Sequence, residues 1–144
     1  GVEVVVASTA VGTARGMFGM QATPDTTVDE VNPAEFDAVV VIGGSGSQTH
    51  LWNNVHVHKI VKALHQQGRL VAAICISPVV LAKVGLLKGK KTTVFRTPTT
   101  INELEKGGAL ISDAPVVVDG KIITGRGPEA AKEFGRKIAD NLLR

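Results

Sequence analysis

The chain contains a single cysteine, Cys75, which ends an apolar run and is followed within three residues by a proline. Residues Leu70 to Pro78 read Leu-Val-Ala-Ala-Ile-Cys-Ile-Ser-Pro, which is typical of a buried strand that turns at once into a helix. A side chain on such a sharp turn needs small neighbours two residues to either side, and Ala73 and Ser77 meet that need. The amino end of the following helix, expected over residues 77–84, favours a thiolate over a thiol. The segment predicts a presented nucleophile, and a buried structural cysteine fits it about equally well.

A glycine-rich loop, Gly43-Gly44-Ser45-Gly46-Ser47, follows another apolar run. It lacks the Gly-Lys-Ser/Thr ending of a phosphate-binding loop, and Thr49 stands where a dinucleotide motif needs its third glycine. A plain turn is therefore favoured over a nucleotide site. The backbone N–H groups of Gly43 and Gly44, with that of Ile76 after the cysteine, are candidates for an oxyanion site that stabilises charge on a substrate oxygen.

Two arginines beside glycines are candidates for holding an anionic substrate. Arg126 lies in Thr-Gly-Arg-Gly-Pro, between an expected strand and the amino end of a helix, where a carboxylate clamp and a plain turn with a surface arginine are equally consistent with the pattern. Arg15, in Thr-Ala-Arg-Gly, is a similar and weaker candidate. Both are retained as substrate-binding candidates.

The four histidines have no spacing that suggests a metal site. His58 and His65 are expected on the outer face of a helix, and His56 diverges from them, so all three are interpreted as solvated surface residues. His50 follows the glycine loop and is retained as a candidate general base or substrate contact, with packing against Trp52 as the alternative.

Composition limits the remaining possibilities. With 144 residues, 44% hydrophobic and 20% charged, the chain is expected to form one domain, residues 1–144, with a single core. A net charge of +3 and 3% aromatic residues offer neither a basic stripe nor a stacking platform, which argues against nucleic-acid binding. No apolar run is long enough to span a bilayer. One cysteine without a recognisable leader sequence indicates a reducing, cytoplasmic location.

The order of expected elements alternates between strands and helices. Strands are expected over residues 2–7, 38–42, 70–75 and 92–95, helices over 54–67, 77–84, 100–106 and from Pro128 onward, and a hairpin over 116–124 with a type I′ turn at Asp119-Gly120. This alternation predicts an α/β fold with a doubly wound, mostly parallel, flavodoxin-like sheet. Sites in such sheets lie at the carboxyl ends of strands, where both the glycine loop and Cys75 fall.

Four segments together resemble the ThiJ/PfpI superfamily, whose fold is related to class I glutamine amidotransferases. They are Asp-Ala-Val-Val-Val-Ile-Gly-Gly (37–44), Ala-Ala-Ile-Cys-Ile-Ser-Pro (72–78), Leu-Leu-Lys-Gly-Lys-Lys (86–91) and Val-Val-Asp-Gly-Lys-Ile-Ile-Thr (117–124). The Ala-Ile-Cys-x-Ser/Gly-Pro signature is specific, and it favours Cys75 as a nucleophile over a structural cysteine.

The resemblance implies a homodimer or higher homo-oligomer, with an oxyanion site at the glycine pair and neither a metal nor an organic cofactor. It implies glyoxalase- or deglycase-type chemistry on a small carbonyl substrate as the leading function. One alternative is a non-catalytic, redox-sensing or chaperone-like dimer that uses the same cysteine, and a second is an intracellular peptidase or amidase. Peptidase-like members place a histidine directly after the cysteine, and Ile76 at that position argues against a Cys-His protease.

Besides Ile76, the chain departs from the resemblance at its start and at Phe95-Arg96. Members of the superfamily open with a further strand and helix that carry a glutamate near the nucleophile, whereas Gly1-Val2-Glu3 resembles their second strand. Since the first strand of a doubly wound sheet is central, we expect an upstream strand and helix of about thirty residues with an acidic residue beside Cys75. Otherwise residues 2–7 must pair directly with 38–42, or a partner must supply a strand. Phe95-Arg96 stands where relatives have a histidine or aromatic residue.

Overall fold

A four-stranded sheet forms the centre of the computed structural model, which describes residues 1–143. Its strand order is β5 (Ala38–Val41), β6 (Leu70–Ile74), β10 (Ile122–Gly125) and β9 (Val116–Asp119). The first three strands run parallel, and β9 pairs antiparallel with β10. The expected mostly parallel α/β sheet is therefore confirmed.

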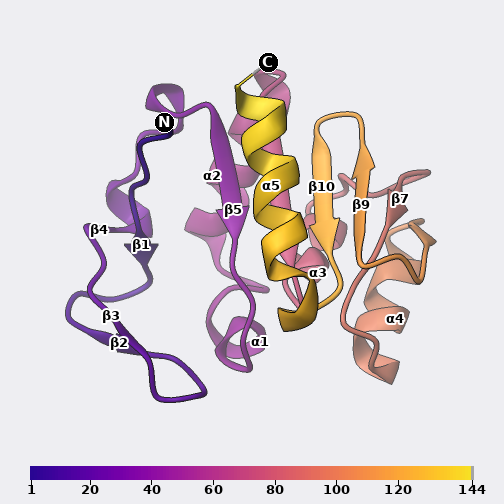
Figure 1. Ribbon diagram of the computed structural model, residues 1–144, viewed down its shortest axis with the longest axis horizontal. Coiled ribbons are helices and arrows are strands. Elements are labelled where there is room, and N and C mark those ends of the chain that lie inside the picture. Colours follow the sequence, from indigo (N-terminus) through magenta and orange to yellow (C-terminus); the bar gives the residue numbers. More distant parts are fainter. Residues whose placement is uncertain (144) are drawn as a thin grey trace.

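Helices cover both faces of this sheet, as in a doubly wound fold (Figure 1). Helix α2 (Val55–Gln66) buries an apolar stripe in a core that it shares with α3 (Pro78–Lys83) and α4 (Pro98–Lys106). On the opposite face, α5 (Ala131–Leu142) packs Phe134 into a second, smaller core. Two separate apolar clusters explain why β6, which lies between them, is buried at every position.

The remaining elements are short. They are the helix α1 (Gly46–His50), the paired strands β7 (Lys91–Thr92) and β8 (Leu110–Ile111), and 3-10 turns at Val28–Glu30, Pro33–Glu35 and Pro128–Ala130. The strand expected over 92–95 is thus reduced to β7. Helix α4 begins earlier than expected because Thr97 and Thr100 form a reciprocal capping box at its amino end. Among residues 1–143, no helix combines the length and apolar character needed to cross a bilayer.

The hairpin between β9 and β10 forms where the sequence predicted it, but its turn type differs. Asp119 pairs with Ile122, so Gly120 and Lys121 are the two loop residues. Of these two residues, only Gly120 has a positive φ, +61°. A type I′ turn requires positive φ at both central positions, whereas a type II′ turn requires it at the first, usually a glycine. The predicted type I′ turn centred on Asp119-Gly120 is therefore wrong: the turn is centred one residue later, and its backbone angles do not fit type I′.

The strand expected over residues 2–7 is also wrong. Only β1 (Ala7–Ser8) forms there, and it pairs with β4 (Thr26–Thr27) in a separate two-stranded sheet. The valines at positions 2, 4, 5 and 6 are exposed. The alternative pairing with residues 38–42 is absent as well, because β5 is bonded only to β6 within the described residues. A β-branched run becomes a strand only where a neighbouring strand pairs with its backbone, and within the described residues no strand pairs with residues 2–5.

Candidate functional site

Cys75 lies on a tight turn between β6 and α3. Its φ of +65° is the only positive value of a non-glycine residue in the described part of the chain. The amide of Cys75 donates to the carbonyl of Gly125 at 2.9 Å, and its carbonyl accepts from the amide of Phe95 at 2.8 Å. Two backbone hydrogen bonds from neighbouring segments therefore hold a strained conformation, and the thiol is half-buried rather than enclosed.

The helix after Cys75 is shorter than expected. Helix α3 has six residues, Pro78–Lys83, and Ser77 occupies its N-cap position without a side-chain capping bond. Proline has no backbone N–H, so the first turn offers one donor fewer than an ordinary helix would. The amino end of α3 therefore has fewer N–H groups than the helix expected over residues 77–84.

The glycine loop packs directly against the cysteine. A Cβ placed on Gly43 would lie 2.5 Å from the Cys75 Cβ and 3.0 Å from the Ile74 carbonyl oxygen, so only glycine fits there. Gly44 has a φ of +102°, which also favours glycine. Within residues 1–143, the N–H groups of Gly43, Gly44 and Ile76 donate to no protein acceptor. The structure thus brings unpaired donors to the turn that carries the thiol.

A pair of buried serine hydroxyls links the glycine loop to the cysteine turn. The Ser77 Oγ lies 2.6 Å from the Ile42 carbonyl oxygen, to which it donates. The Ser47 Oγ lies 2.6 Å from the Ser77 Oγ. Ser77 was singled out from the sequence only as a small residue, and Ser47 was not singled out. No local pattern could have identified the pair, because 30 positions separate its members.

A second set of hydrogen bonds supports the residue after the cysteine. The indole N–H of Trp52 donates to the Ile76 carbonyl at 3.0 Å, and the Nε2 of His58 donates to the Trp52 carbonyl at 2.6 Å. His58 is half-buried, so its interpretation as a solvated surface residue is wrong. His50, at the end of α1, is exposed rather than packed against Trp52.

Arg126 directly follows β10, whose last residue, Gly125, is bonded to the amide of Cys75. Its Nε donates to Glu129 Oε1 at 3.0 Å and its Nη1 to the Asp113 carbonyl at 2.7 Å. The pKa of Glu129 is lowered, first by its own backbone N–H and then by the Arg126 guanidinium, so this carboxylate stays ionised. Arg126 is therefore near the turn, with two of its donors already committed.

The other arginine candidate is placed elsewhere. Arg15 ends β2 (Ala14–Arg15), which pairs only with β3 (Gln21–Ala22) in a two-stranded sheet of its own, and it is exposed. Arg96, which follows the Phe95 amide bonded to Cys75, forms an ion pair with the Asp113 carboxylate. Of the sequence-based candidates, the structure joins the glycine pair and Ile76 to the Cys75 turn, places Arg126 beside it, and leaves Arg15 apart.

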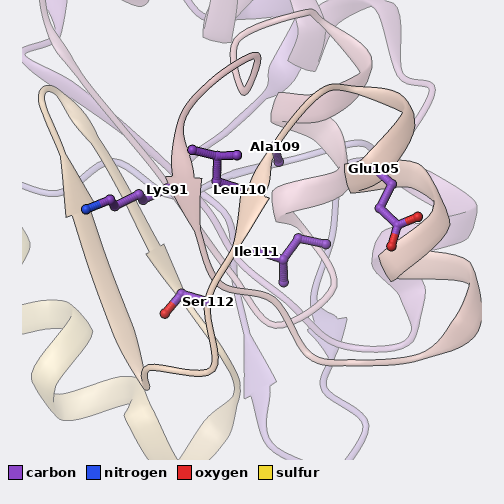
Figure 2. A pocket seen from close by; sticks show the side chains of 6 residues that line it. All are labelled: Lys91, Glu105, Ala109, Leu110, Ile111 and Ser112. Carbon is purple, nitrogen blue, oxygen red and sulfur yellow. The ribbon is translucent and has the colours of Figure 1, made fainter.

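A surface hollow of the described chain lies away from this turn. Figure 2 shows its lining, on and near β7, β8 and the end of α4: Lys91, Glu105, Ala109, Leu110, Ile111 and Ser112. The lining includes neither a thiol nor an imidazole, and the side chains of Lys91 and Glu105 point away from one another. Within residues 1–143, no group of three or more His, Cys, Asp or Glu side chains is arranged to hold a metal ion. The Cys75 turn is therefore the better candidate site.

Comparison with known proteins identifies relatives along almost the whole chain. Residues 1–141 match the DJ-1/PfpI family. An uncharacterized protein of Methanocaldococcus jannaschii is 46% identical over 138 residues, which are 96% of this chain and 67% of that protein. A protein of Thermococcus kodakarensis named as a deglycase is 40% identical over 128 residues, 89% of this chain and 75% of the relative.

A solved structure agrees with the fold. The ThiJ/PfpI domain protein from Brachyspira murdochii superimposes with a TM-score of 0.89 at 32% sequence identity. The match covers 95% of this chain and 78% of that protein. Both the resemblance stated from the sequence and the flavodoxin-like fold are confirmed by these comparisons.

Proposed function

Because the chain belongs to the DJ-1/PfpI family, we propose that it acts on small reactive carbonyl compounds with Cys75 as nucleophile, in glyoxalase- or deglycase-type chemistry. The observation that carries the proposal is the close packing of the Gly43 backbone against Cys75, beside unpaired N–H groups. A Cβ placed on Gly43 would lie 3.4 Å from the Cys75 Sγ atom. The deglycase name of a relative that is 40% identical supports the substrate class.

The first chemical step is addition. The Cys75 sulfur forms a bond to the carbonyl carbon, the π electrons of the C=O bond move to oxygen, and the oxyanion then takes a proton from water to give a hemithioacetal. For an α-oxoaldehyde, removal of the hemithioacetal C–H proton and protonation of the neighbouring carbonyl oxygen give an enediol. A proton then adds to the former ketone carbon, while the hydroxyl beside sulfur loses its proton and becomes the carbonyl of a thioester. Hydrolysis by one water then releases a 2-hydroxy acid and the thiol. The sum is substrate plus water, so no external oxidant or reductant is needed.

The groups around Cys75 have separate roles in this scheme. The N–H groups of Gly43, Gly44 and Ile76 stabilise the oxyanion as the C–S bond forms. Arg126 holds an anionic or polar substituent with the part of its guanidinium that Glu129 and Asp113 leave free. Arg15 has no role in a single chain, because its sheet is separate, and His50 stays a candidate substrate contact on the exposed end of α1.

Consumption of methylglyoxal by the purified protein tests the proposal. We expect loss of the dicarbonyl and appearance of an equal amount of lactate without any added thiol or nucleotide. A peptide substrate should remain uncleaved, since Ile76 stands where a histidine would be needed. If no dicarbonyl is consumed but Cys75 is oxidised by stoichiometric peroxide to sulfenic and sulfinic acid, the redox-sensing alternative replaces this proposal.

We also propose that the chain forms a homodimer. The loop joining β2 and β3 carries exposed apolar side chains, among them Phe18, which is 84% exposed, and Met20, which is 81% exposed. Side chains of this kind, clustered on one projecting hairpin, favour association with another protein surface.

Sedimentation should show a dimer at micromolar concentration, and Phe18→Glu should shift it toward monomer. The matched control is Val55→Glu, which replaces a residue 70% exposed at the start of α2 and should leave the dimer unchanged. A wild-type monomer would contradict the proposal.

A further inference from the structure

We propose that the hydroxyl pair of Ser47 and Ser77 positions the Gly43–Gly44 loop against Cys75, and thereby determines how well the site stabilises charge on a substrate oxygen. The inference rests on the proposed function for its chemical readout, but its structural basis is independent. Neither serine is a candidate for contact with substrate, because Ser47 is 2% and Ser77 0% exposed. Both are therefore positioning residues.

The direction of the two hydrogen bonds follows from their partners. A serine hydroxyl has one proton to donate. The Ser77 proton is used on the Ile42 carbonyl, which can only accept. The contact between the two hydroxyls must then be donated by Ser47 and accepted by the Ser77 oxygen. The result is one directed chain from Ser47 through Ser77 to Ile42.

This chain fixes the glycine loop from both of its ends. Ile42 immediately precedes Gly43, and its carbonyl is bound by Ser77. Ser47 closes the other end, since its amide donates to the Gly44 carbonyl at 3.0 Å while its hydroxyl reaches Ser77. Both attachments therefore converge on a single oxygen atom, the Ser77 Oγ.

The same residue is tied to the turn that carries the nucleophile. Ser77 lies two positions after Cys75, and its amide donates to the Ile74 carbonyl at 3.1 Å. Consecutive glycines have no side chains with which to fix their own backbone, and they lose more conformational freedom than other residues when they are ordered. A displacement of about 1 Å at a reacting centre lowers rates by about a hundredfold. The hydrogen bonds of the Ser77 hydroxyl to Ile42 and Ser47 thus restrain the glycine loop, which has no side chains of its own to do so at Gly43 and Gly44.

The decisive experiment compares two reactions of the same thiol in Ser77→Ala. Alkylation by iodoacetamide requires only an accessible thiolate, whereas addition to methylglyoxal also requires the oxyanion donors. We expect methylglyoxal turnover to fall by at least about tenfold in kcat, with little change in KM, because the misplaced donors act on the transition state. Iodoacetamide alkylation should stay within about twofold of wild type. The control Ser8→Ala, in the separate β1–β4 sheet, should change neither reaction.

Ser47→Ala and the double variant provide a second arm. Ser47→Ala keeps the bond from Ser77 to Ile42, so its effect should be smaller than that of Ser77→Ala. The double variant should be no worse than Ser77→Ala alone, because the two hydroxyls act through one chain. Additive losses would overturn the proposal, and so would equal losses of alkylation and turnover in Ser77→Ala. If Ser77→Ala does not fold, Ser47→Ala alone provides the test. Its methylglyoxal turnover should fall more than its rate of alkylation by iodoacetamide, and equal losses would overturn the proposal.

Hydrogen exchange separates this inference from the proposed function. In Ser77→Ala, the amide of Ser47, which donates to the Gly44 carbonyl, should exchange faster than in wild type, while the amides of α5 should be unchanged. If wild-type protein does not react with methylglyoxal but this local loss of protection is observed, the proposed function fails and the positioning role stands. Unchanged exchange of the Ser47 amide would overturn the positioning role whatever the activity.

Discussion

Replacing Cys75 by serine is expected to lower methylglyoxal turnover by at least about a thousandfold while the protein stays folded. The two side chains are similar in size, and the hydrogen bonds that hold residue 75, to Gly125 and Phe95, are made by its backbone. A serine hydroxyl is a poor nucleophile unless a base removes its proton. Among residues 1–143, no histidine or acidic side chain is hydrogen-bonded to the Cys75 sulfur, so serine would find no such base.

The measurement is kcat/KM for methylglyoxal, with thermal unfolding of the same preparation to show that the fold is kept. Cys75→Ala should behave like Cys75→Ser, because neither presents a thiolate. Ser8→Ala, which alters a distant serine, serves as the control for handling and should match wild type. Turnover by Cys75→Ser within tenfold of wild type would show that the chemistry does not pass through this sulfur.

Gly43→Ala should impair both stability and activity through one added methyl group. The new Cβ would lie 2.5 Å from the Cys75 Cβ and 3.0 Å from the Ile74 carbonyl oxygen, which are not flexible chain ends that could move aside. Relieving such an overlap costs about 1–3 kcal/mol, and shifting the loop from the thiol lowers turnover by about a hundredfold. Urea unfolding and kcat/KM on the same sample measure the two effects.

Gly135→Ala is the matched control for this substitution. A Cβ on Gly135 meets nothing within 4 Å, and the residue lies in the interior of α5, so alanine should stabilise the protein by about 0.5–1 kcal/mol without changing turnover. The pair isolates the effect of position from that of adding a methyl group. Equal stability and activity in Gly43→Ala and wild type would show that the glycine loop does not press against Cys75 in solution.

Features governed by neighbouring residues were the ones predictable from the sequence. The helix after Asn54 was predicted from the 3.6-residue spacing of its apolar side chains and from Gly68 beyond its end, and α2 buries that stripe. The structure adds a cap at its amino end, where the Asn54 side chain accepts from two amides. The turn at Cys75 was likewise predictable, because an apolar run followed by Ser-Pro is a local signal. The parallel arrangement of β5, β6 and β10 followed from the alternation of strands and helices.

Features that depend on pairing across the fold were not predictable. Residues 2–6 have strand-forming side chains, and only the positions of other strands decide whether they pair. The register of β9 and β10 moved the turn from Asp119-Gly120 to Gly120-Lys121. His58 lies on the face of α2 opposite its apolar stripe by periodicity, yet the Trp52 carbonyl reaches it there. Each case involves a contact whose partner the local pattern does not specify.

The positive φ of Cys75 has a consequence for attempts to engineer this protein. A non-glycine residue in the left-handed region raises the free energy of the folded state by about 1–2 kcal/mol in every molecule, with or without substrate. Glycine would remove that strain, so a search for thermostable variants that scores only resistance to unfolding is biased toward losing the thiol. Selection for heat resistance in this scaffold must therefore be coupled to a screen for thiol chemistry, or residue 75 must be held constant.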